Sequence, residues 1–171
     1  MTDIQATAVT TSIVVDAPVE QAFAVFTEDM AGWWPPEHHI IEVPLAEMVM
    51  EPWVGGRIYD VGNDGSECQW ARVLAYDPPS RLVFSWDISL QWKVQTDQAK
   101  ASEVEVRFIA EEPNRTRVEL EHRHLDRHGD GWEAMRDGVG SPDGWNSGLR
   151  QFALWVASDS RTSGSTGVTA G

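Results

Sequence analysis

Two histidines, His122 and His124, stand at the end of a segment in which apolar and charged residues alternate. If residues 116–124 form a strand, successive side chains point to opposite faces, and both histidines share a face with Val118 and Leu120. The apolar members mark that face as inward, so we expect both imidazoles to point toward the interior or its rim. There they could act as acid or base. The alternative is that they are only hydrogen-bonded within a polar patch.

A His-x-His pair on a strand can also bind zinc, but protein zinc sites usually take three or four ligands. No third ligand stands at a recognisable spacing, because Asp126 and His128 come after the expected end of the strand. We therefore expect no metal. The sequence also lacks a phosphate-binding loop, a dinucleotide fingerprint, a lipase elbow and a paired-carboxylate motif, and we expect no cofactor.

Arg72 is a third candidate for acid–base chemistry and lies in a long strand-like segment, residues 67–76. In a regular strand one face would carry Cys68, Trp70, Arg72, Leu74 and Tyr76. If this face points inward, Arg72 brings a charge that must be paired or must meet a polar ligand group. We favour the inward orientation for Trp70, because large aromatic side chains tend toward burial. Cys68, the only cysteine, is interpreted as a small packed thiol rather than a nucleophile.

Nine tryptophans occur in 171 residues. A buried indole needs a partner for its N–H, so the ring is a demanding core filler, whereas aromatic side chains suit a cavity for a flat apolar molecule. Ordinary core packing remains the alternative for any one ring. The expected ligand-binding residues are Trp33, Trp34, Trp70, Phe84, Trp86, Phe108, His122, His124, Trp145, Phe152 and Trp155.

The charge of the chain narrows the range of partners. There are 27 acidic and 13 basic side chains, for a formal net charge of −14. Such a surface repels phosphate backbones and anionic lipid, so we expect neither nucleic-acid nor membrane binding. The N-terminus has no basic and apolar leader pattern, and a single cysteine fits a reducing compartment. We expect a cytoplasmic protein.

The apolar pattern predicts a strand over 8–15, a helix that begins at Pro18, and a short second helix that ends at Trp33-Trp34 before Pro35-Pro36. The His38-His39 pair that follows is expected in a solvent-facing loop. Further strands are expected over 46–51, 57–61, 67–76, 81–88, 103–109 and 116–124. Residues 91–102 read as a loop and 126–144 as a loop or broken helix. A last amphipathic helix is opened by Ser141-Pro142-Asp143.

This order predicts an α+β fold, because hairpin-length connections imply an antiparallel sheet. We expect a curved sheet of about six or seven strands around a long C-terminal helix, with two short helices after the first strand and an internal hydrophobic cavity. Residues 1–157 would form one domain. The Ser/Thr/Gly-rich segment 158–171 is expected to be a disordered tail.

The motifs in this order resemble one protein family. They are Asp16–Glu20 with Trp33-Trp34, Gly55-Gly56-Arg57 with Asp64-Gly65, Asp77–Trp86, Val118–His122 with Leu125 and Gly129, and Gly144-Trp145. Together they resemble START-like (SRPBCC, birch-pollen-allergen type) domains over residues 8–157, in the branch named after the activator of the heat-shock-chaperone ATPase. The resemblance implies a helix-grip fold around a hydrophobic cavity. It does not imply one function, since members include ligand carriers, polyketide cyclases, co-chaperone-like domains and resistance proteins.

A narrower resemblance points to proteins of enediyne-antibiotic gene clusters, which bind the drug or are cleaved in its place. It is carried by Trp33-Trp34-Pro35, Glu121–Arg127 and Gly144-Trp145. Our leading hypothesis is a noncatalytic or weakly catalytic binder of an aromatic or polyketide-like molecule, with antibiotic self-resistance as one form of it. The second is a metal-free cyclase or dehydratase that uses His122, His124 or Arg72. The third is a co-chaperone-like interaction domain. A monomer or a weak homodimer is expected.

Overall fold

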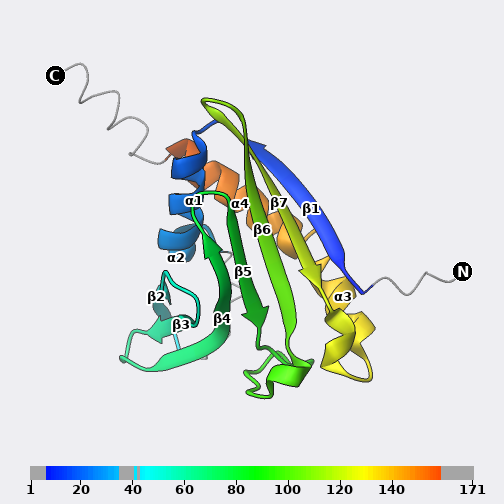
Figure 1. Ribbon diagram of the computed structural model, residues 1–171. Coiled ribbons are helices and arrows are strands. Elements are labelled where there is room, and N and C mark those ends of the chain that lie inside the picture. The colour runs from blue at the N-terminus through cyan, green and yellow to red at the C-terminus, as the bar shows by residue number, and fades with distance from the viewer. Residues whose placement is uncertain (1–6, 35–40, 42, 159–171) are drawn as a thin grey trace, which may run out of the picture.

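The computed structural model describes residues 7–34, 41 and 43–158. Its helices and strands are β1 (Val9–Val15), α1 (Val19–Glu28), α2 (Met30–Trp33), β2 (Leu45–Met50), β3 (Arg57–Gly62), β4 (Glu67–Asp77), β5 (Arg81–Trp86), β6 (Ser102–Glu112), β7 (Arg115–Arg123), α3 (Trp132–Val139) and α4 (Trp145–Ser158), with the 3-10 turns η2 (Gln98–Lys100) and η3 (Leu125–His128) (Figure 1). The His38-His39 pair and the tail from residue 159 lie outside the described residues.

Within the described residues, seven strands form one antiparallel sheet in the order β1-β7-β6-β5-β4-β3-β2. The first strand therefore pairs with the last, and Val9 lies opposite His122. Helix α4 crosses one face of the sheet, with α1 and α2 at one of its ends and α3 at the other (Figure 1). The α+β class, the curved antiparallel sheet and the helix-grip arrangement are confirmed.

The two faces of the sheet differ in chemistry, as the alternation along the strands predicts. On β6, Val104, Val106 and Phe108 are buried beneath the helices. Between them, Glu105 points to the outer face and accepts a 2.7 Å hydrogen bond from Arg81 Nε, and Arg123 from β7 pairs with the same carboxylate. Because both guanidiniums hydrogen-bond it, the pKa of Glu105 stays below its ordinary value although burial alone would raise it.

Strand β4 departs from strict alternation at two β-bulges. Ile58 lies opposite Ala71 and Tyr59 opposite Gln69, so Trp70 is an extra residue in the ladder; Leu74 is extra against β5. Each bulge shifts the side-chain pattern by one position. Trp70 and its neighbour Ala71 are therefore both buried. The inward orientation of Trp70 is confirmed, but the face that we predicted it to share with Arg72 is wrong.

Several further boundaries differ from the sequence predictions: the strand predicted over 81–88 ends at Trp86, and the one predicted over 103–109 spans Ser102–Glu112. The segment 126–144 is ordered into η3 and α3, and η2 stands within 91–102. The last helix begins at Trp145 rather than at Ser141–Asp143, which form the turn before it. Gly144 fits that turn because a Cβ there would lie 2.2 Å from the Val139 carbonyl oxygen. Together, η3 and the turn before α4 bring His128 and Trp145 near the end of β7 that carries His122.

Candidate functional site

Four indoles from four separate elements converge on one place in the core. They belong to Trp34 after α2, Trp70 on β4, Trp86 on β5 and Trp145 at the start of α4. Ring centroids are 5.3 Å apart for Trp34 and Trp70, 5.8 Å for Trp70 and Trp86, and 5.6 Å for Trp86 and Trp145. Trp34 closes the ring of contacts on Trp145 at 5.6 Å, nearly perpendicular to it. We call these four residues the indole cluster.

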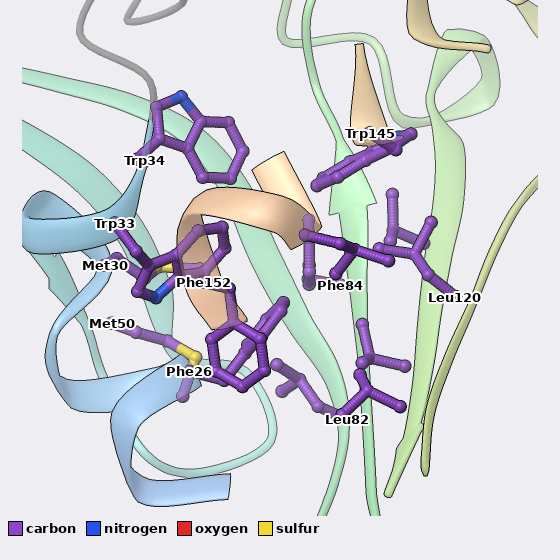
Figure 2. Close-up of a cluster of buried hydrophobic side chains, with 14 of the residues drawn as sticks. Phe26, Met30, Trp33, Trp34, Met50, Leu82, Phe84, Leu120, Trp145 and Phe152 are labelled. Carbon is purple, nitrogen blue, oxygen red and sulfur yellow. The ribbon is translucent and has the colours of Figure 1, made fainter. Parts of the chain in front are cut away.

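Figure 2 shows Trp34 and Trp145 on the same side of this core, with Phe84 beside Trp145. Phe84 contacts both Trp70 and Trp145, at centroid distances of 6.0 and 6.5 Å. Edge-to-face and tilted contacts of this kind stabilise an aromatic pair by about 0.5–1.5 kcal/mol beyond burial of area. The indole cluster is therefore a buried, mutually packed set of rings, held by strands on one side and by helices on the other.

Three further predicted residues, Trp33, Phe108 and Phe152, form a second group around Phe26. Phe26 packs against Trp33 at 4.7 Å, Phe152 at 5.4 Å and Phe108 at 5.6 Å. Trp33 links this group to Trp34 at 5.6 Å. All of these residues are buried. We interpret Phe108, Phe152 and Trp33 as the packed floor beneath the indole cluster.

The indole N–H groups are not equally satisfied. Trp70 Nε1–H donates to Asp60 Oδ1 at 3.0 Å, and Trp145 Nε1–H donates to His122 Nδ1 at 3.0 Å. Trp86 and Trp33, by contrast, have buried Nε1–H groups with no acceptor among the described residues. A buried donor without an acceptor costs about 1–3 kcal/mol. The Trp86 N–H is therefore a buried donor within the indole cluster that has no acceptor among the described residues.

A chain of polar side chains begins at the indole cluster. Trp145 Nε1–H donates to His122 Nδ1, His122 Nε2 lies 2.8 Å from Ser102 Oγ, and that oxygen lies 2.7 Å from His128 Nε2. An indole N–H is only a donor, so His122 Nδ1 must carry no proton. A neutral His122 therefore has its proton on Nε2 and donates to Ser102 Oγ, whose own proton goes to His128 Nε2. We call Trp145, His122, Ser102 and His128 the polar relay.

Burial keeps the inner histidine of the relay neutral. His122 is fully enclosed, and desolvation lowers its pKa to about 3, helped by the neighbouring charge of His128. Burial also lowers the pKa of His128, while the carboxylate of Asp87 opposes that shift. Asp87 in turn accepts two 3.0 Å hydrogen bonds from Arg72. The carboxylate that opposes the shift at His128 is thus itself part of an ion pair with Arg72.

Three predicted site residues, His124, Trp155 and Arg72, lie elsewhere. His124 is exposed and left-handed, with φ of 61°, because β7 ends at Arg123 and the chain turns there into η3. The inward orientation predicted for His124 is wrong. Trp155 is 39% exposed and its Nε1–H donates to Asp29 Oδ2 at 3.3 Å, so its predicted position in the cavity wall is also wrong.

Trp155 instead lines a surface pocket of about 480 Å³ together with Glu28, Asp29, Ala31, Gly32, Glu47, Met48 and Ser158. Helix α4 carries its buried stripe through Phe152 and Val156, and Trp155 projects to the side of it, over α2. Arg72 likewise lies between the buried Ala71 and Val73 on its strand, so its side chain points to the opposite face and pairs with Asp87.

Sequence reasoning missed Ser102, His128 and Asp87. Ser102 lies directly across the ladder from Trp86, at the predicted end of a loop. His128 follows the predicted strand, and the turn η3 folds it back toward β6. Because of this turn, His128 is buried and His124 is exposed.

Within the described part of the chain, no group of three His, Cys, Asp or Glu side chains could hold a metal ion. Across the same residues, no helix is long and apolar enough to cross a membrane. The groups of the polar relay are nitrogens and a hydroxyl, which can exchange protons. We keep the absence of a metal as a prediction.

Comparisons with a family model and with solved structures agree with this fold. The model of a family described as activator of Hsp90 ATPase homolog 1-like protein matches residues 16–156. Among solved structures, the chain is 42% identical to an anthrahydroquino-γ-pyrone synthase, Txn09, complexed with a compound designated SUM, with a TM-score of 0.62 over 86% of this chain and 95% of that chain.

A second solved structure is CalC, a self-sacrificing resistance protein from Micromonospora echinospora. It is 28% identical, with a TM-score of 0.63 over 87% of this chain and 93% of that chain. The Aha1 dimer from Colwellia psychrerythraea is 15% identical, with a TM-score of 0.58 over 87% and 95% of the two chains, and shows similarity of fold alone. No curated protein matches.

Proposed function

Because this chain belongs to the family of activator-of-Hsp90-ATPase-homolog-1-like proteins, within the START-like (SRPBCC) group, we propose a function from its own site rather than from the family name. The chain binds a planar, polycyclic aromatic molecule of polyketide type and closes an oxygen-containing ring on it. The 42% identity to a γ-pyrone synthase over 95% of that chain supports the reaction class. A shared fold alone would not, since one fold hosts many functions.

The observation that carries the proposal is the unpartnered N–H of Trp86 in the indole cluster. Flat aromatic rings match the faces of Trp34, Trp70 and Trp145, and the cluster contains few polar groups to orient such a ligand. A ketone oxygen on the ligand would accept the Trp86 N–H and thereby satisfy a buried donor. The ring of His122 lies 5.0 Å from that of Trp86, so an acid–base group stands beside the same point.

Closing a pyrone-type ring joins a phenol oxygen to an electrophilic carbon of a ketone-bearing side chain. The phenol loses its proton, the C–O bond forms as a π bond of the electrophilic carbon breaks, and the electron pair of that π bond takes up a proton at the ketone oxygen or at the carbon beside the ketone. A neutral base near the phenol and an N–H donor near the ketone serve the two halves of this step. We assign the contact with the phenol to His122 and the contact with the ketone to Trp86.

The test uses the full chain and a panel of hydroxyanthraquinones that carry ketone side chains. Binding is followed by quenching of tryptophan fluorescence, and conversion by liquid chromatography with mass spectrometry. Trp86→Phe removes the N–H and keeps an aromatic ring; we expect affinity to fall about 3- to 10-fold, as one neutral hydrogen bond of about 0.5–1.5 kcal/mol predicts. The control is Trp53→Phe, at a residue that is 55% exposed. Failure of every planar aromatic compound to bind would overturn the proposal.

Sequestration is the second candidate, and the 28% identity to CalC over 93% of that chain favours it. In that case the chain would bind the same class of molecule without converting it. Expression of the chain should then raise the tolerance of a sensitive host to a toxic member of that class, and unchanged sensitivity of the host would exclude this role. A chaperone partner is the weakest alternative, because the likeness to the Aha1 structure concerns the fold alone.

A further inference from the structure

We propose that His128, rather than His122, stores the phenol proton during ring closure, with His122 and Ser102 passing it along without either becoming charged. This inference rests on the proposed function and adds to it the residue that acts as the base. It follows from the order of hydrogen bonds in the polar relay, from the burial of its inner end and from the charge at its outer end.

The inner end of the relay has no means of holding a charge. His122 is completely buried among the rings of Trp86 and Trp145, whose centroids lie 5.0 and 6.1 Å from its own. Its two nitrogens contact an indole N–H and a hydroxyl, and its strand neighbour across β6 is Val104. An imidazolium in such surroundings would lack a counter-charge and would be costly. A base that works by accepting charge at His122 is therefore disfavoured.

The direction of the hydrogen bonds allows His122 to act without charge. Its Nδ1 is an acceptor, and its Nε2 proton already points at Ser102 Oγ, which points its own proton at His128 Nε2. A ligand hydroxyl that donates to His122 Nδ1 must displace the Trp145 N–H, and an oxygen atom of the ligand must then accept that N–H. Each group in the chain then has one proton to receive and one to give.

Transfer along this chain balances. The phenol proton moves to His122 Nδ1, the Nε2 proton of His122 moves to Ser102 Oγ, and the Ser102 proton moves to His128 Nε2. His122 ends as its other neutral tautomer, Ser102 ends as a hydroxyl, and the products are a phenolate and an imidazolium at His128. After the C–O bond forms, the reverse transfers return the proton to the ring-closed ligand.

A positive charge costs less at the outer end of the relay than at its inner end. His128 ends η3 and is 9% exposed, whereas His122 is fully buried. Burial lowers the pKa of His128, and the Asp87 carboxylate opposes that shift, in the direction of the protonated imidazole. Arg72 fixes that carboxylate through two hydrogen bonds of 3.0 Å. Asp87 and Arg72 are thus positioning residues, which touch neither the ligand nor the reacting atoms in this scheme.

The test separates binding from proton transfer. In Ser102→Ala the relay is interrupted while the indole cluster stays intact, so we expect the ligand Kd to change less than threefold and kcat to fall 100-fold or more, as loss of a general base predicts. Ser102→Thr restores the hydroxyl and should recover kcat to within tenfold of the unmodified chain. Ser85→Ala removes another buried hydroxyl, whose oxygen accepts the Arg72 backbone N–H instead, and should leave kcat unchanged.

The outcomes distinguish the two proposals. No conversion by the unmodified chain overturns the ring-closing function itself. Conversion that is equally fast in Ser102→Ala overturns the relay and leaves the ring-closing function standing. Nitrogen-15 NMR of the unmodified chain gives a readout that does not depend on turnover: His122 should carry its proton on Nε2 and not on Nδ1. The opposite tautomer would overturn the relay even if Ser102→Ala failed to fold.

Discussion

Trp145 and Trp86 form a matched pair for measuring the Trp145–His122 hydrogen bond. Both indoles are 5% exposed, and their rings touch at 5.6 Å. Trp145 Nε1–H has His122 Nδ1 as its acceptor at 3.0 Å, whereas Trp86 Nε1–H has no acceptor among the described residues. Replacing either by Phe removes a similar volume, so the difference between the two variants isolates the hydrogen bond.

The magnitudes follow from that difference. The lost ring volume should cost about 1–2 kcal/mol in either variant. Trp145→Phe also leaves the buried Nδ1 of His122 without a donor, which adds about 1–3 kcal/mol, whereas Trp86→Phe removes a donor that was unsatisfied. We expect Trp145→Phe to be about 2 kcal/mol less stable than Trp86→Phe. With an m-value of about 2 kcal/mol/M, the urea midpoints of the two variants should differ by about 1 M.

Urea unfolding followed by far-ultraviolet circular dichroism measures both midpoints without relying on the mutated fluorophores. Repeating the pair in a His122→Phe background removes the acceptor, and there the two substitutions should cost the same within about 0.5 kcal/mol. Equal destabilisation by Trp145→Phe and Trp86→Phe in the unmodified background would refute the assignment of the hydrogen bond, and with it the tautomer that we deduce for His122.

Three further predictions concern other parts of the chain. Burial lowers the pKa of His122 to about 3, so the contribution of its neutral form to stability, on the order of 4 kcal/mol, is complete above pH 6.5 and is lost as the pH falls from 6.5 toward 3. Urea titrations at pH 7 and 5.5 should therefore show a fall in the free energy of unfolding that is smaller in His122→Gln than in the unmodified chain. An equal fall in both would contradict this prediction. A Cβ on Gly32 would lie 2.4 Å from the Trp155 ring. Gly32→Ala should therefore lower the free energy of unfolding by about 1 kcal/mol more in the unmodified chain than in a Trp155→Ala background, as measured by thermal unfolding. Equal losses in the two backgrounds would argue against that contact. Arg72→Gln leaves the buried carboxylate of Asp87 without its partner and should cost about 2–4 kcal/mol, whereas an Arg72→Gln/Asp87→Asn double variant should recover part of that loss; no recovery would exclude the pair as its source.

Much of the fold could be predicted because it depends on regular periods. On β7 the alternation of Val118, Leu120 and His122 with charged residues gave the correct inward face, and the structure buries all three. The helix-grip arrangement followed from the order of elements and from the family resemblance. These features need only a residue's identity and its distance along the chain.

The site was harder to predict because it depends on departures from those periods. Trp70 and Arg72 stand two residues apart, yet a bulge at Trp70 places them on opposite faces of β4. His124 and His128 exchange roles because the chain leaves the strand at Arg123 and turns. A bulge or a left-handed residue is set by contacts with neighbouring strands, and the local sequence does not specify it.

The pairing of β1 with β7 has a consequence for how the molecule is made. Val9 pairs with His122 in the ladder, and the Thr11 hydroxyl donates to the Asn146 side chain at the start of α4. Both partners lie more than a hundred residues later in the chain. Such long-range pairing gives a high contact order and slow folding. During synthesis the first strand therefore leaves the ribosome well before its partner, and both ends of the polar relay belong to the late-made part of the chain. The finished sheet and the polar relay should therefore form together, only after the last helix is released.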